Sequence, residues 1–157
     1  MSPELHRRLA NPDMGRACPL AEVGAKLARL LPKKHAAELS ALSAHHGGAS
    51  HADKVAATAK HDTIQSRALA LEDQLTWGPA ETLEGAAFAI SVAFSRLQLV
   101  KIYVSPEDEQ HVQAIARALW SARHALEQST GKVLAPAVAG FLMPERMNPF
   151  LALGDEA

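Results

Sequence analysis

Apolar positions recur through the middle of the chain at alternating steps of four and three residues, the spacing that places side chains on one face of an α-helix. Two such seams stand on either side of Trp77-Gly78-Pro79. The first comprises Ala57, His61, Ile64, Ala68, Leu71 and Leu75, and the second comprises Leu83, Ala87, Ile90, Phe94 and Leu97. Glycine tolerates the conformation that ends a helix, and proline suits the first turn of the next one. The pattern therefore predicts helices at 51–76 and 79–103.

The pattern nearer the N-terminus predicts a helix that is interrupted by a proline. The apolar residues at helical spacing are Leu20, Val23, Leu27 and Leu30. Because Pro32 disfavours helical backbone at the residue before it, we expect a break at Leu31 and a second piece over 32–46. Leu39 and Leu42 are the apolar face of this second piece.

Two helix starts and one helix end carry strong local signals. Ser50 and Ser105 can each accept a hydrogen bond from the first-turn backbone. Ser105 is also followed by a proline and three carboxylates, which favour the positive end of the helix dipole. Thr130-Gly131 is a typical helix end. A long helix is therefore expected at 106–130.

These elements predict an all-α fold, an antiparallel helical bundle of three to four long helices with an apolar C-terminal tail. A chain of 157 residues has the usual size of one domain. We therefore assign 18–157 to a single helical-bundle domain that includes the tail at 132–157. Residues 1–17, in which prolines and a glycine stand among charges, are expected to form a flexible arm.

The helix expected at 79–103 is apolar on two sides, and such a helix is usually buried on two sides. It belongs either at the centre of the bundle or in a subunit interface. The apolar tail likewise either covers a groove of its own bundle or wraps a second subunit. We predict a homo-oligomer, most simply a dimer. The expected interface residues are Phe88, Val92, Leu99, Phe141 and Phe150.

Composition and charge narrow the class of partner. Sixteen Lys and Arg against seventeen Asp and Glu leave a net charge of −1, without a basic stripe, so we expect neither nucleic acid nor an anionic membrane surface as a partner. The uncharged apolar stretch 85–95 covers about half of the ~20 residues that span a membrane, and no membrane span is expected. A single cysteine, Cys18, allows no intramolecular disulfide, which fits the cytoplasm. The partner is expected to be an unknown protein.

Histidine placement is the one chemical hint in the sequence. His45, His46 and His51 stand at one expected helix–helix tip, and imidazole is a good ligand for transition metals such as zinc, copper or nickel. Asp53 and the seam residue His61 complete this candidate metal site. The alternative is structural, because a histidine in the last turn of a helix interacts favourably with the helix dipole and a loop histidine is commonly solvated.

The sequence contains no phosphate-binding glycine loop, no nucleophile elbow and no zinc-protease helix motif. Cys18 begins a helix, where backbone N–H groups could lower the pKa of its thiol, but no base stands near it in sequence. We therefore assign no catalytic residue and no required cofactor, and interpret the chain as a self-associating interaction module. Metal or small-ligand binding at the histidines is the alternative. A small enzyme is a third hypothesis, because a pocket between helices leaves no trace in a sequence.

One junction carries a resemblance. Its residues are Pro79, Ala80, Thr82, Leu83, Gly85 and Ala86. They resemble the Pro-Ala-x-Thr-Leu-x-Gly turn that links two helices in a group of small uncharacterised proteobacterial helical proteins. The resemblance implies a helical hairpin of bacterial origin. It implies no activity, no substrate and no functional residue.

Overall fold

The computed structural model describes residues 18–151, and along them the chain forms five α-helices, one short 3-10 turn and no strand. The all-α prediction is confirmed. The elements are α2 (Pro19–His46), α3 (His51–Trp77), α4 (Leu83–Lys101), α5 (Pro106–Thr130), α6 (Pro136–Leu142) and η1 (Glu145–Met147). The arm expected at 1–17 and the end of the tail lie outside the described residues.

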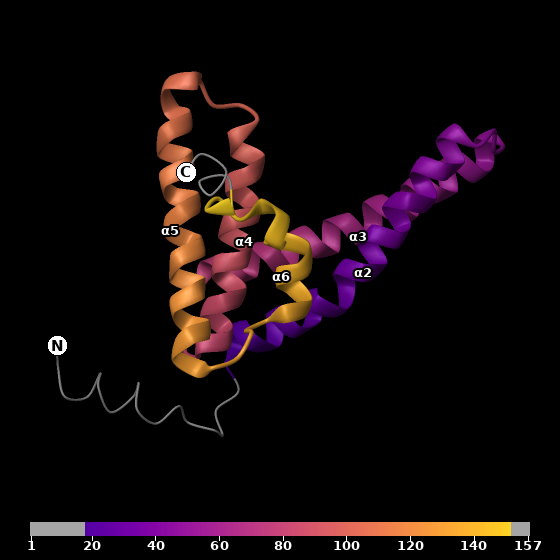
Figure 1. The fold of residues 1–157 in the computed structure, drawn as a ribbon. Helices are drawn as coiled ribbons and strands as arrows, with labels where there is room; N and C mark the ends of the chain where they lie inside the picture. The colour runs from indigo at the N-terminus through magenta and orange to yellow at the C-terminus, as the bar shows by residue number, and fades with distance from the viewer. Residues whose placement is uncertain (1–17, 152–157) are drawn as a thin grey trace.

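Two antiparallel helical hairpins, α2–α3 and α4–α5, cross each other, and the chain returns through α6 beside the crossing (Figure 1). Helix α4 is the central element, because it packs against α2, α3, α5 and α6. The tip of the α2–α3 hairpin extends away from the other helices (Figure 1). In this outer part, α2 and α3 lie alongside only each other.

The core forms where α4 crosses α2 and is closed by the tail. Its largest fully buried side chains include Leu27, Leu75, Val92 and Val138. Helix α2 approaches α4 closely at Gly24, where an added Cβ would overlap the ring of Phe88. In a second cluster, Phe94 packs edge-on against Trp120 with ring centroids 5.5 Å apart. Both predicted seams therefore supply core side chains.

The strong local helix signals are confirmed. Ser50 and Ser105 accept hydrogen bonds from the backbone N–H groups three residues on, at 3.2 and 3.3 Å. Gly131 ends α5 in the left-handed conformation, with φ of 63°. That conformation costs little only for glycine. Local hydrogen bonding therefore sets these termini.

Two predicted boundaries are wrong. Helix α2 continues through Pro32 without ending. The proline removes one hydrogen bond and adds a local clash, and this cost is offset by packing of α2 on both sides of it, where Leu27, Leu31 and Ala37 are buried. Helix α4 begins at Leu83 rather than at Pro79, because the hydroxyl of Thr82 accepts a hydrogen bond from the N–H of Gly85 at 3.1 Å and caps the first turn there.

The second apolar face of α4 is covered by the chain itself. Phe88 is 4% exposed and Val92 is fully buried, so these two predicted interface residues lie in the core of the chain and not on its surface. The other three predicted interface residues, Leu99, Phe141 and Phe150, are 42 to 55% exposed. The described part of the tail lies on the bundle's own groove, where its residues Val138, Ala139, Leu142 and Met143 are buried.

Candidate functional site

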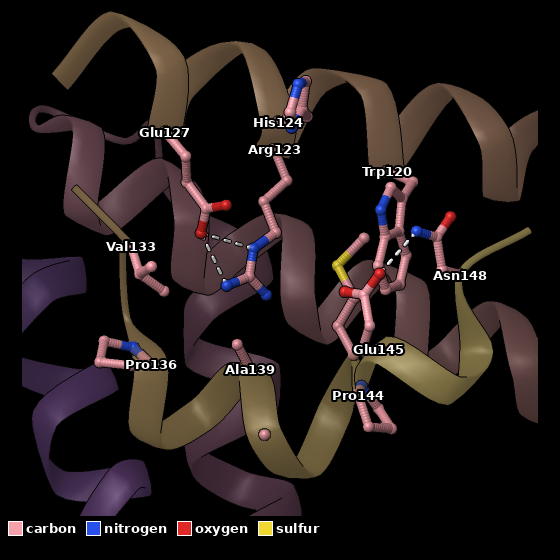
Figure 2. A pocket seen from close by; sticks show the side chains of 12 residues that line it. Trp120, Arg123, His124, Glu127, Val133, Pro136, Ala139, Pro144, Glu145 and Asn148 are labelled. Carbon is pink, nitrogen blue, oxygen red and sulfur yellow. Dashed lines mark hydrogen bonds and ion pairs between the residues drawn. The ribbon is translucent and has the colours of Figure 1, made fainter. Parts of the chain in front are cut away.

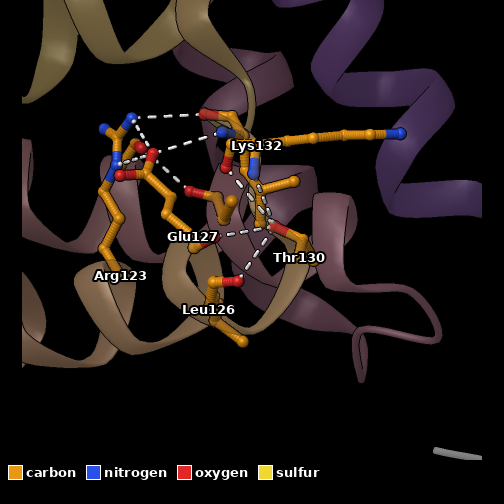
Figure 3. A network of polar contacts seen from close by, with 8 residues as sticks. Arg123, Leu126, Glu127, Thr130 and Lys132 are labelled. Atoms are coloured by element: carbon orange, nitrogen blue, oxygen red, sulfur yellow. Dashed lines mark hydrogen bonds and ion pairs between the residues drawn. The ribbon is translucent and has the colours of Figure 1, made fainter. Parts of the chain in front are cut away.

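An ion pair inside α5 holds the tail against the bundle. The Arg123 side chain is 9% exposed and donates from Nε and Nη2 to Oε1 of Glu127, at 3.1 and 2.8 Å. The same Nη2 donates to the carbonyl oxygen of Leu134 at 3.2 Å, and the N–H of Leu134 donates to Glu127 Oε1, also at 3.2 Å. Figure 3 shows these contacts between α5 and the segment that follows Gly131. The network therefore fixes the direction in which the tail leaves α5.

The sequence carries only a weak signal for this network. Arg123 and Glu127 are four residues apart, which is also the spacing of ordinary solvated pairs on a helix surface. Their burial depends on the tail that covers them. The last turn of α5 is stabilised by the Thr130 hydroxyl, whose Oγ1 lies 3.1 Å from the carbonyl oxygens of Leu126 and Glu127.

Arg123 and Glu127 also line a cleft of about 470 Å³ between α5 and the tail. Figure 2 shows Arg123 and Glu127 on α5, Trp120 farther along that helix, and Glu145 and Asn148 opposite Trp120. Glu145 accepts a hydrogen bond from Asn148 at 2.8 Å. The charged groups of the cleft are thus bonded to other groups of the chain, and across residues 18–151 no buried side-chain nitrogen or oxygen lacks a partner. We assign no reaction to this cleft.

The histidine candidates do not converge on one point. His45 lies 3.2 Å from the Thr58 hydroxyl, and His61 lies 3.1 Å from the carboxylate of its neighbour Asp62. Asp53 is hydrogen-bonded to the hydroxyl of Ser50 at 2.6 Å, as part of the α3 cap. His46 and His51 flank the hairpin tip and are exposed. Within the described range, no three His, Cys, Asp or Glu side chains form a group that could hold a metal ion, so the metal hypothesis gains no support.

Cys18 is buried at the start of α2, with 3% of its surface exposed. Burial raises the pKa of the thiol. The Thr82 hydroxyl and the backbone N–H groups of Ala21, Glu81 and Leu20 lower it, and together they leave the pKa below the usual value. The lowered pKa means that the fold favours the thiolate form.

The free energy of unfolding should therefore depend on pH through Cys18. The pKa of the Cys18 thiol is lower in the folded chain than in the unfolded chain. The folded state therefore becomes more stable as pH rises through the folded-state pKa, and the increase is complete above the unfolded-state pKa of about 8.5. Denaturant titrations of the wild type and Cys18→Ser between about pH 7 and about pH 10 measure this effect. The free energy of unfolding of the wild type, relative to that of Cys18→Ser, should increase as pH rises. A difference that stays constant with pH would show that the thiol does not titrate in this way.

The outer part of α2 turns its leucines toward solvent. Leu39 and Leu42 are 53% and 50% exposed, so the apolar face predicted for this part of α2 is turned toward solvent. Small side chains supply the packing face instead, since Ala37 is buried and Ala41 and Ala44 are half-buried. Alanines let α2 and α3 approach closely, and this leaves the larger apolar side chains on the outside.

Helix α4 is the one described helix that is long and apolar enough to cross a membrane, by length and composition only. The core helix of a globular protein meets the same criterion, and α4 buries Ala87, Phe88, Val92 and Phe94 against other helices. The absence of a membrane span stays a prediction.

No model of a protein family matches the chain, and no similar curated protein or solved structure was found. The resemblance of the Pro79–Ala86 junction to proteobacterial helical proteins therefore stays a prediction.

Proposed function

We propose that this protein is a helical interaction module that self-associates as a two-fold homodimer in the cytoplasm and acts by binding a protein partner. The observation that carries the proposal is the projecting end of the α2–α3 hairpin (Figure 1). Half or more of the surface of Leu39, Leu42 and Val55 is exposed there. Exposed apolar side chains gathered on one projecting element are typical of a surface that binds another protein.

Other exposed apolar side chains lie outside the hairpin and are compatible with a second contact. Leu99, Val100, Ile102 and Tyr103 are exposed at the far end of α4. The charge balance of the chain also supports a protein partner, because a net charge of −1 provides no strong field for binding a polyanion. We further propose that α4 does not cross a membrane, since its core side chains already pack against the chain's other helices.

Sedimentation equilibrium of the full chain over a wide concentration range tests the proposal. We expect a monomer–dimer equilibrium, with a mass of twice 16.8 kDa at the upper end. Native mass spectrometry of the same sample should give the dimer of bare polypeptide. A monomer at every concentration would contradict self-association, and a stoichiometric added mass would instead favour a ligand-binding protein.

A further inference from the structure

Four residues form a stripe along the exposed side of α2. They are His35, Leu39, Leu42 and His46, and we call them the outer α2 stripe. Their steps of four, three and four residues place them on one helix face. All four are exposed, and the part of α2 that carries them runs from the edge of α6 to the tip of the hairpin (Figure 1). The stripe thus has two leucines at its centre and an imidazole at each end.

The outer α2 stripe has the same order of residues in both directions along the helix. A two-fold rotation about an axis midway between its leucines places Leu39 on the partner's Leu42 and His35 on the partner's His46. A two-fold dimer requires such a self-complementary surface. We propose that a second copy of this chain binds the outer α2 stripe, with the two α2 helices antiparallel about this axis. This inference rests on the proposed function and names the surface through which it acts.

The placement of Glu38 favours the antiparallel arrangement over a parallel one. Glu38 is next to Leu39 at the edge of the stripe, and antiparallel pairing brings it level with the partner's Ser43 and within one turn of the partner's His46. An imidazole N–H can donate to the carboxylate there. Parallel pairing would instead bring the carboxylates of Glu38 and the partner's Glu38 to the same level, where like charges repel.

The end of α6 extends the surface available to the partner. The helix overlap from His35 to His46 is about 17 Å long, which by itself is short of the roughly 800 Å² per subunit that a stable dimer buries. Antiparallel pairing brings the partner's hairpin tip level with a cleft of about 350 Å³ between α2 and α6. Phe141 lines this cleft, is 42% exposed and meets His35 edge-on at 6.3 Å. The tip would cover Phe141 and enlarge the contact.

Sedimentation equilibrium of the double variant L39E/L42E tests the surface. Four carboxylates would meet at the two-fold axis, so the dimer should weaken roughly 100-fold or more. Both leucines are at least half exposed, and circular dichroism should show the wild-type helix content and melting temperature. Ile115→Glu is the matched control, because Ile115 is 50% exposed on α5 and lies outside the surfaces proposed to bind a partner. It should dimerise as the wild type does.

The charge-swapped variant L39E/L42K tests the direction. In the antiparallel dimer each carboxylate faces an ammonium group of the partner, so this variant should dimerise at least about 10-fold more tightly than L39E/L42E. In a parallel dimer like charges would face each other and no recovery would occur. Two further variants give a reciprocal check. L39K/L42K should dimerise as weakly as L39E/L42E, and L39K/L42E should dimerise as tightly as L39E/L42K.

The outcomes separate this inference from the proposed function. A wild-type dimer that L39E/L42E leaves intact overturns the inference and keeps self-association through another surface. Loss of the dimer in L39E/L42E without recovery in L39E/L42K overturns the antiparallel arrangement. A wild-type monomer overturns both the inference and the proposed function.

Discussion

Glu127→Ala is expected to lower the free energy of unfolding by about 3 kcal/mol, because it leaves the guanidinium of Arg123 buried without its carboxylate. The Arg123 side chain is 9% exposed and that of Glu127 is 23% exposed, so solvent screens the pair only weakly. The substitution also removes the acceptor of the Leu134 N–H. Denaturant unfolding followed by circular dichroism measures the loss. Hydrogen exchange should show faster exchange of the Leu134 amide than in the wild type.

Two companion variants test the cause of this loss. Glu127→Gln keeps an oxygen that can accept from Arg123 and from Leu134, so it should lose less than Glu127→Ala. Adding R123M to E127A removes the uncompensated charge and should recover part of the stability. A Glu127→Ala protein within about 0.5 kcal/mol of the wild type would contradict the assignment of the network as a tether.

Gly24→Ala is expected to lower the free energy of unfolding by about 2 kcal/mol. The new Cβ would overlap ring atoms of Phe88, and that ring is 4% exposed in the core, so it cannot move without displacing its neighbours. Overpacking costs about 1 to 3 kcal/mol, and the overlap with several ring atoms places this substitution at the upper end. The gain in helix propensity of about 1 kcal/mol offsets part of that cost and leaves the net loss of about 2 kcal/mol. Thermal and denaturant unfolding measure the difference.

Gly140→Ala is the matched control for Gly24→Ala. An added Cβ at Gly140 meets nothing within 4 Å, so this variant should be as stable as the wild type or slightly more stable. Combining Gly24→Ala with Phe88→Leu should cost less than the two single losses together, because the smaller side chain leaves room for the methyl group. Additive losses would show that the close approach of α2 to α4 is not the cause.

The starts of α3 and α5 and the end of α5 could be predicted because they depend on contacts within a few residues. The hydroxyls of Ser50 and Ser105 bond to N–H groups three positions away, and Gly131 adopts a left-handed conformation that favours glycine. Such interactions form with the neighbouring chain alone. The all-α class follows from the same local patterns together with the four-three spacing of apolar residues.

The candidate site was harder to predict because side chains that are close in sequence need not point toward one another in the folded chain. Three of the predicted metal ligands, His45, His46 and His51, do lie at one hairpin tip, yet they form no metal-binding group there. Conversely, Arg123 and Glu127 are hydrogen-bonded to the backbone of Leu134, which lies in the tail beyond the end of their own helix. Spacing along one helix does not show which pairs another segment will cover.

The sequence by itself therefore determined the helical class, the caps of α3 and α5 and the end of α5, since each depends on local hydrogen bonds or on local backbone preference. Only the tertiary structure decided which apolar face is buried. It placed Phe88 and Val92 inside the chain and left Leu39 and Leu42 at the surface. It also kept α2 helical through Pro32. The reason is that burial depends on the summed packing of several helices, which outweighs the preference of any single residue.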